Sequence, residues 1–328
     1  MESVIVGCIV SNNPIFAIAR IARSIFREGN GKRVFAAMIP LQAYLDDSSD
    51  GKKEQVVCAG AVVGNELNWP LLEEAWLERL KQDEIEYFRT TECKGVHGAF
   101  YKLRRKYGYS GAQAIARKLR DDLEAILLAH PWYGFGIAAL VSDYLEVWNS
   151  VPDAKLFYRE DPTEATFSTI FFEIAAHAQD ISPEYQVAYI IDDSSYSGII
   201  AEAFKGLKHN HPNLPIARLA PLDDKKTPAL QMADLFANIT KDSFLQWLID
   251  GKPKITGFDH KWQNHVAVLG RWDKEHMLKS IEKNLKDPRY AAGLFPKRST
   301  QKFKRQLRHD EKMRRKALIK SIGARNEK

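Results

Sequence analysis

The sequence lacks the features that mark several large classes of protein. Its 328 residues include only three cysteines, Cys8, Cys58 and Cys93. These are too few and too widely spaced to indicate a disulfide framework or a zinc ribbon. No run of residues approaches the roughly 18 consecutive apolar positions of a membrane span, so we expect no membrane association. A reducing, cytoplasmic location is the default expectation for such a chain.

Common catalytic and nucleotide-binding motifs are also missing. Neither GxxxxGK[ST] nor GxGxxG occurs, and no serine lies in a G-x-S-x-G motif. The histidine pairs 209/211 and 260/265 have no further ligands at zinc-binding spacing. The chain contains 45% hydrophobic and 27% charged residues, a composition typical of a soluble protein that can form a buried core.

Basic charge is concentrated at the end of the sequence. Residues 297–328 contain 13 Lys and Arg against 3 Asp and Glu, which leaves 35 basic and 39 acidic residues elsewhere. A tail of this kind can bind phosphate backbones, and Arg305, Arg314 and Arg315 are the contacts that we expect in that case. A solvated helical extension is an equally good interpretation.

The composition also suggests how the chain is divided. Residues 1–37 contain five Lys and Arg and two acids, which is typical of a transit peptide, of a loose extension or of a wrongly assigned start. We exclude them from the fold argument. We expect one domain over residues 38–250, with an insertion at about 66–131. Residues 251–296 would form an appendage that packs on this domain.

Hydrophobic periodicity predicts an α/β fold. Strands are expected at 40–47, 54–64, 132–144, 185–193 and 214–222, and helices at 68–82, 111–130, 163–180, 197–210 and 227–250. The first two strands are joined by a hairpin turn, whereas the later strands are joined through helices, which favours parallel pairing. The prediction is a mixed five-stranded sheet, antiparallel and then parallel, flanked by helices and with a helical insertion between strands two and three.

Two similar phrases, "AYLDDSSDG" and "AYIIDDSSYSG", place acids at strand ends. Asp46 and Asp47 end the first strand, and Asp192 and Asp193 end the fourth. If these strands are parallel neighbours, their terminal acids meet at one edge of the sheet. Strand alternation separates the two acids of each pair but does not say which of them faces the site. The simpler alternative is a turn or a helix cap at each position.

A third acid, Asp234, lies in "LQMADL" on an otherwise apolar helix whose small residues Ala233 and Ala237 would allow close approach to the sheet. A buried carboxylate is costly unless it is paired or bound to metal. Clustered carboxylates repel one another and raise their own pKa values, and a divalent cation removes that penalty. Oxygen ligands without Cys or His favour Mg²⁺ or Mn²⁺. Two such ions can hydrolyse a phosphodiester.

The motifs "YLDDSS", "WPLLEEAW", "YIIDDSS" and "LQMADL" resemble those of the family named domain of unknown function 3800 (DUF3800), which is regarded as similar to the ribonuclease H-like superfamily. The resemblance covers roughly Leu41 to Asp250. It implies that Asp46, Asp192 and Asp234 are metal ligands. The sequence departs from the family pattern by having an aspartate, Asp47, in place of the usual glutamate; Asp47 keeps a carboxylate and is a further expected metal ligand.

The sequence does not decide which residue is the fourth acid of the site. The resemblance implies a glutamate from the first core helix, for which Glu173 is the candidate, and Glu92 is a rival. Gln231 matches the glutamine of the family but has no assigned role. Arg89 and Lys94 flank Glu92 and are the expected phosphate contacts.

The prediction is therefore a hydrolase, a metal-dependent nuclease with two Mg²⁺ or Mn²⁺ ions. The alternative is a non-catalytic module that binds nucleic acid or another partner on the same fold. The sequence leaves open RNA or DNA as substrate, endo- or exonuclease action, and homo-oligomer formation.

Overall fold

The computed structural model describes residues 41–50, 55–182, 185–193, 197–250, 262 and 264–286. The strands are β1 (Leu41–Ser49), β2 (Val56–Asn65), β3 (Tyr133–Leu140), β4 (Val187–Asp192), β5 (Ile216–Leu222) and β6 (Val266–Trp272). The helices are α2 (Trp69–Gln82), α3 (Thr90–Gly95), η1 (Gly98–Phe100), α4 (Tyr101–Ala129), α5 (Val141–Ser150), α6 (Ala154–Phe157), α7 (Pro162–Ile181), α8 (Ser197–Asn210), η2 (Asp224–Lys226), α9 (Pro228–Asp250) and α10 (Lys274–Lys286).

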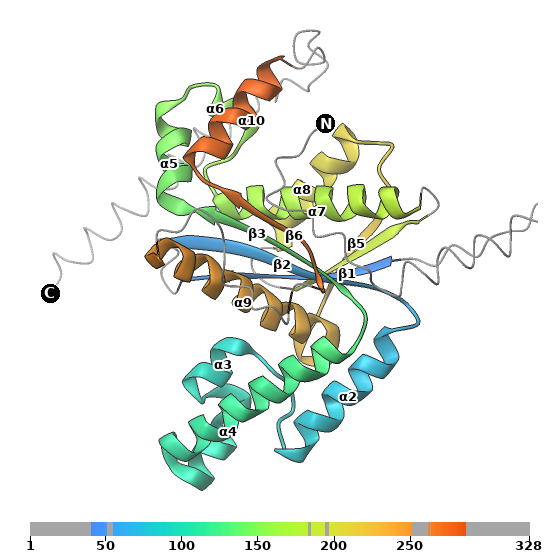
Figure 1. The fold of residues 1–328 in the computed structure, drawn as a ribbon, viewed down its shortest axis with the longest axis vertical. Coiled ribbons are helices and arrows are strands. Elements are labelled where there is room, and N and C mark those ends of the chain that lie inside the picture. Colours follow the sequence, from blue (N-terminus) through green and yellow to red (C-terminus); the bar gives the residue numbers. More distant parts are fainter. Residues whose placement is uncertain are drawn as a thin grey trace, which may run out of the picture.

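The strands form one mixed sheet in the order β5-β4-β1-β2-β3-β6 (Figure 1). β2 pairs antiparallel with both β1 and β3, whereas β4 pairs in parallel with β1 and β5. The α/β class and the mixed sheet are thus confirmed. The expected number of five strands is wrong, because β6 adds a sixth strand, parallel to β3, from the segment that we expected to be an appendage.

Helices cover both faces of the sheet. α9 lies on one face, and α7 and α8 lie on the other (Figure 1). The side chains of β1 divide accordingly, since Tyr44 packs in the core that contains the buried residues of α9, whereas Ala43 and Leu45 pack with those of α7 and α8. Alternation along β1 therefore decides which face each of the following residues joins.

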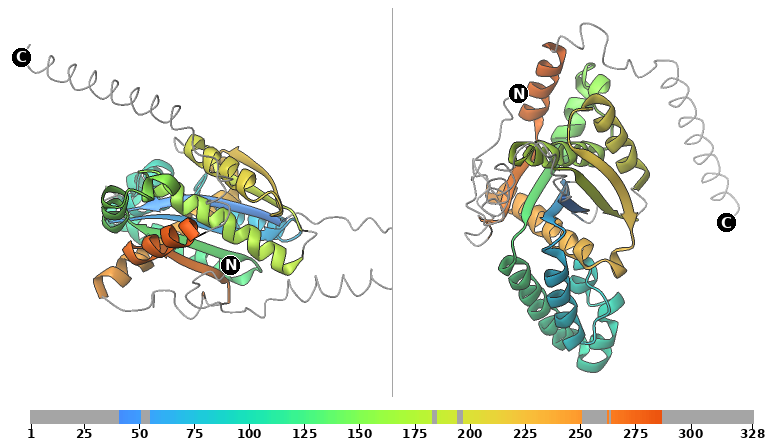
Figure 2. Two further views of the ribbon diagram at one scale, coloured as in Figure 1. Left: turned by 90° about the horizontal axis from the view of Figure 1, so that it is seen from above. Right: turned by 90° about the vertical axis from the view of Figure 1, so that its right-hand side faces the viewer.

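Helices α2, α3 and α4 lie between β2 and β3 in the chain, where we expected a helical insertion. We call residues 69–129, which carry these helices, the helical arm. Figures 1 and 2 show it projecting on the α9 side of the sheet. Trp76 of α2 and Leu119 of α4 are fully buried and join the same core as α9. The arm is thus packed on the domain through apolar side chains.

Two element boundaries differ from the prediction. The strand expected at 132–144 ends at Leu140, because its partner β2 begins opposite it at Val56. The chain then turns into α5, where Val141, Tyr144 and Val147 are buried at helical spacing. α4 begins at Tyr101, ten residues earlier than expected, and continues through a non-helical Gly108.

The described helices include none that is both long and apolar enough to cross a membrane.

Candidate carboxylate site

Two aspartates near the ends of neighbouring strands lie on the α9 face of the sheet. Asp46 and Asp47 do not end β1 as expected, because the strand continues to Ser49 through its pairing with β2. Leu45 of β1 pairs with Ile191 of the parallel strand β4, so Asp46 and Asp192 follow at equivalent positions on neighbouring strands. Parallel strands are about 4.8 Å apart. Asp46 alternates with Leu45 and therefore shares the face of Tyr44. Ile190, two residues before Asp192, packs in the same core as Tyr44.

α9 carries Asp234 to this edge by an unusually close approach to the sheet. A Cβ atom added at Gly60 of β2 would lie 2.5 Å from the Cα of Ala237. Gly60 is the cross-strand partner of Asp46. Asp234 lies one helical turn before Ala237, and its Oδ2 accepts a hydrogen bond of 2.6 Å from the backbone N–H of Thr90. Ala237 thus allows the close approach to the sheet that the sequence predicted.

A fourth carboxylate, Asp224, was missed by the sequence analysis. It is buried, at 6% exposure, in η2, directly after β5. A signal was present, because "DD" follows β5 at Asp223 and Asp224 as it does the other two strand ends. Asp223 accepts a hydrogen bond from the N–H of Lys225 and caps η2. An aspartate pair therefore lies at or near the end of each of three adjacent parallel strands.

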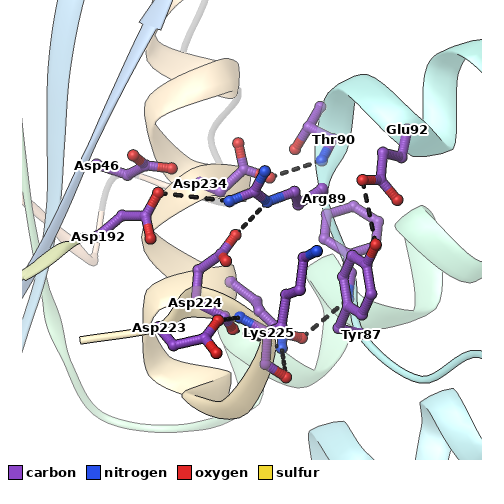
Figure 3. Close-up of polar contacts among 12 residues, drawn as sticks. Asp46, Tyr87, Arg89, Thr90, Glu92, Asp192, Asp223, Asp224, Lys225 and Asp234 are labelled. Atoms are coloured by element: carbon purple, nitrogen blue, oxygen red, sulfur yellow. Dashed lines mark hydrogen bonds and ion pairs between the residues drawn. The ribbon is translucent and has the colours of Figure 1, made fainter. Parts of the chain in front are cut away.

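Arg89 lies among these carboxylates (Figure 3). Its Nη2 is 3.4 Å from the Oδ2 of Asp192, and its Nε donates a hydrogen bond to Asp224. Arg89 comes from the helical arm, immediately before Thr90, the residue that contacts Asp234. The hydrogen bond to Asp224 is the main reason why the pKa of Arg89 is raised above its ordinary value. The arm thus supplies a permanent cation to a cluster of four acids.

The raised pKa values of the clustered aspartates show that these carboxylates are buried and repel one another. Burial raises the pKa of Asp46 well above its ordinary value, and the charge of Asp234 raises it further. Burial also raises the pKa of Asp234, to about 6. The pKa of Asp192 is raised by burial and by the charge of Asp224, although Arg89 opposes this shift. One guanidinium against four carboxylates leaves an excess of three negative charges when all are ionised.

Gln231 joins the two sides of the site. Its Oε1 accepts hydrogen bonds of 3.0 Å from the indole N–H of Trp76 and from the backbone N–H of Phe88. Its Nε2 donates a hydrogen bond of 3.0 Å to the backbone carbonyl of Asp224. Phe88 immediately precedes Arg89, so this buried glutamine positions both members of the Arg89–Asp224 pair. The structure therefore gives a positioning role to a residue that had none from sequence.

Several expected site residues do not join the cluster. Asp47 alternates with Asp46 and pairs with Ala59, which packs in the core on the α7 face. Glu173 belongs to α7 itself, and burial there raises its pKa. Asp193 is exposed, and its backbone N–H donates to Leu222. Asp47 and Glu173 cannot reach the cluster because the sheet separates the α7 face, on which they lie, from the α9 face.

Glu92 and Lys94 have structural contacts instead. Glu92 accepts hydrogen bonds from the hydroxyl of Tyr87 and from the N–H of Ala99, which ties the loop between α3 and α4 (Figure 3). Lys94 forms an ion pair of 3.1 Å with Asp242 of α9. The expected contacts Arg305, Arg314 and Arg315, and the segments 1–37 and 297–328, lie outside the described residues.

The donor set suits a hard divalent cation, because all four side chains offer carboxylate oxygens. As the side chains stand, no three acidic, histidine or cysteine residues of the described ranges are grouped so as to hold an ion. Arg89 lies where a cation would be expected, in contact with Asp192 and Asp224. A bound cation and the guanidinium would therefore compete for these two carboxylates. Comparison of the sequence with protein-family models and with curated proteins found no match.

Proposed function

We propose that this protein is a Mg²⁺- or Mn²⁺-dependent nuclease with a ribonuclease H-like fold, as the resemblance to the DUF3800 family implies. The observation that carries the proposal is the convergence of Asp46, Asp192 and Asp224 from three adjacent parallel strands, joined by Asp234 of α9. Within β1 to β5 the order is the expected one, an antiparallel meander followed by parallel strands. β6 is then an addition beside β3.

In this proposal Asp46, Asp192 and Asp234 hold the ions, with Asp224 as a fourth ligand. When bound, the ions supply an activated water and stabilise the leaving oxygen of a phosphodiester. Arg89 leaves the acids and contacts a phosphate, for which a guanidinium is well suited. The raised pKa values of Asp46 and Asp234 support this assignment, since clustered acids that destabilise one another are typical of functional sites.

A second candidate is a non-catalytic module that binds nucleic acid or another partner. One observation favours it. Arg89 already pairs with Asp192 and Asp224, and this pairing neutralises part of the cluster without metal. In that case the acids and the arginine would serve to join the helical arm to the sheet.

A cleavage assay distinguishes the two candidates. The full chain is incubated with labelled single-stranded and double-stranded RNA and DNA, with Mg²⁺, with Mn²⁺ and with a chelator. The nuclease proposal predicts cleavage that needs the metal and that falls at least a hundredfold in Asp46→Asn and Asp234→Asn, while Asp193→Asn cleaves like the wild type. Cleavage by both site variants at the wild-type rate would overturn the site, and no cleavage of any substrate would favour the binding module.

A further inference from the structure

The beginning of α4 is the most basic part of the described chain. Residues 93–120 contain eight Lys and Arg and no Asp or Glu. In Figure 1 this end of α4 lies far from the sheet, at the outer end of the helical arm. The second view of Figure 2 shows the arm projecting in the same way. A solvent-facing surface with an excess of one charge sign attracts a partner of the opposite sign.

Five of these eight basic residues fall into two groups; of the others, Lys102 pairs with Glu86 and Lys118 pairs with Asp122. Lys94 and Arg120 lie 3.1 and 3.9 Å from Asp242 and tie the arm to α9. Arg104, Arg105 and Lys106 are exposed, and within the described ranges none of them forms an ion pair with an acid. The second group therefore contributes little to the fold and remains available to an anionic partner.

Exposed aromatic rings accompany the second group. Tyr101, Tyr107 and Tyr109 are 55%, 47% and 49% exposed, although Leu103 between them is buried. The guanidinium of Arg104 lies 5.4 Å from the ring centroid of Tyr109, and the ammonium of Lys106 lies 5.0 Å from that of Tyr107. Each cation is thus held beside an aromatic face, so that charge and a stacking surface are presented together.

Gly108 separates the two outer tyrosines. Its φ of +69° is non-helical and bends the chain between Tyr107 and Tyr109. A Cβ atom added at Gly108 would meet nothing within 4 Å. The bend is thus open to solvent rather than imposed by packing. The positive φ that glycine allows thus places a turn between two exposed tyrosines.

We propose that this surface binds single-stranded nucleic acid, with the basic side chains on phosphates and the tyrosines stacked on bases. We call it the arm patch; it consists of Tyr101, Arg104, Arg105, Lys106, Tyr107 and Tyr109. Stacking requires free base faces, which a single strand offers and a duplex does not. From Arg89 the chain runs through α3 and η1 directly into Tyr101, so the patch and the carboxylate site belong to one structural unit. The inference deepens the proposed function and rests on it.

The test is a binding titration of the full chain in a chelator, with a fluorescently labelled 20-nucleotide oligo(dT) or oligo(U). The triple variant R104Q/R105Q/K106Q should bind about ten- to hundredfold more weakly at 100 mM salt, and its salt slope should fall by about 2, because three phosphate contacts are lost. Tyr107→Ala and Tyr109→Ala should each weaken binding about fivefold or more. The matched control K279Q/K283Q/K286Q removes the same charge from exposed positions of α10 and should bind like the wild type.

Other results would overturn the assignment. Equal losses in the two triple variants would mean that only net charge matters. Loss of polyglutamate binding in parallel with oligonucleotide binding, with no effect of the tyrosines, would indicate a general anion surface or an acidic protein partner. Because binding is measured without metal, the patch can be supported even if the chain cleaves nothing, and it can fail even if cleavage is observed.

Discussion

Ala237 of α9 packs directly on Gly60 of β2, with no room for a side chain between them. Gly60 is the strand partner of Asp46, and Asp234 lies one helical turn from Ala237. This contact therefore helps to fix the separation between a carboxylate of the sheet and a carboxylate of the helix. It also explains why an acid on an apolar helix face reaches the strand ends.

The first prediction concerns this contact. In Gly60→Ala the new methyl group would lie 2.5 Å from the Ala237 Cα, so α9 must move away from the sheet. We expect a loss of about 1–3 kcal/mol in the free energy of unfolding, measured with urea. Gly206→Ala in α8 is the control, because nothing lies within 4 Å of its added Cβ, and it should be neutral or stabilising. Equal effects in the two variants would contradict the close packing.

The second prediction concerns pH. Asp46 and Asp234 have pKa values raised by burial, so between pH 4 and pH 6 these two residues bind more protons in the folded protein than in the unfolded chain. Without divalent ions, the free energy of unfolding should therefore fall as pH rises through this window. For Asp234 alone, a shift from 3.8 to about 6 corresponds to on the order of 3 kcal/mol.

Asp46→Asn should flatten this pH profile and should be more stable than the wild type at pH 7, because one mutually repelling charge is gone. Asp193→Asn removes an exposed acid from the same sheet edge and is the control variant. Urea unfolding at a series of pH values measures both variants. A wild-type stability that rises from pH 4 to pH 6 would show that other groups outweigh the cluster.

The third prediction concerns Gln231. Gln231→Leu keeps the volume but leaves the N–H groups of Trp76 and Phe88 without their acceptor. We expect a loss of about 2–4 kcal/mol in unfolding free energy, since each buried unsatisfied donor costs about 1–3 kcal/mol. Trp76→Phe removes one donor together with its need for an acceptor. The double variant Trp76→Phe with Gln231→Leu should therefore be less destabilised than the two single effects added together.

The fourth prediction concerns Arg89. Arg89→Gln removes the cation beside Asp192 and Asp224 and raises the local negative charge, so Mn²⁺ should bind more tightly. Cleavage should nevertheless fall at least tenfold, because the phosphate contact is lost. Calorimetric Mn²⁺ titration and the cleavage assay give the two readouts. Weaker Mn²⁺ binding would mean that Arg89 organises the acids for the metal rather than competing with it.

Much of this arrangement could be predicted from local sequence patterns. The apolar runs that end in "DD" identified β1 and β4, and the small residues of α9 identified its close approach to the sheet. These features depend on neighbours in the chain, which a sequence displays directly. The same logic applied to "PLDDKK" would have found Asp224.

Other features depend on contacts that are distant in sequence. Which face of the sheet Asp46 and Asp192 share is decided by α9, and the side of the sheet that carries Glu173 is decided by the packing of α7. The pairing of Arg89 with Asp224 joins two segments 135 residues apart. Neither hydrophobic periodicity nor spacing contains that information. The sixth strand was missed for the same reason, because β6 pairs with the distant strand β3.

The central claim is that Asp46, Asp192, Asp224 and Asp234 form a divalent metal site. Anomalous diffraction from crystals grown with Mn²⁺ tests it most directly. We predict at least one Mn²⁺ peak within about 2.5 Å of carboxylate oxygens of Asp46 and of Asp192 or Asp234, with Arg89 displaced from Asp192. Crystals at the same Mn²⁺ concentration with no peak at these acids, and with Arg89 still paired to Asp192 and Asp224, would contradict the account.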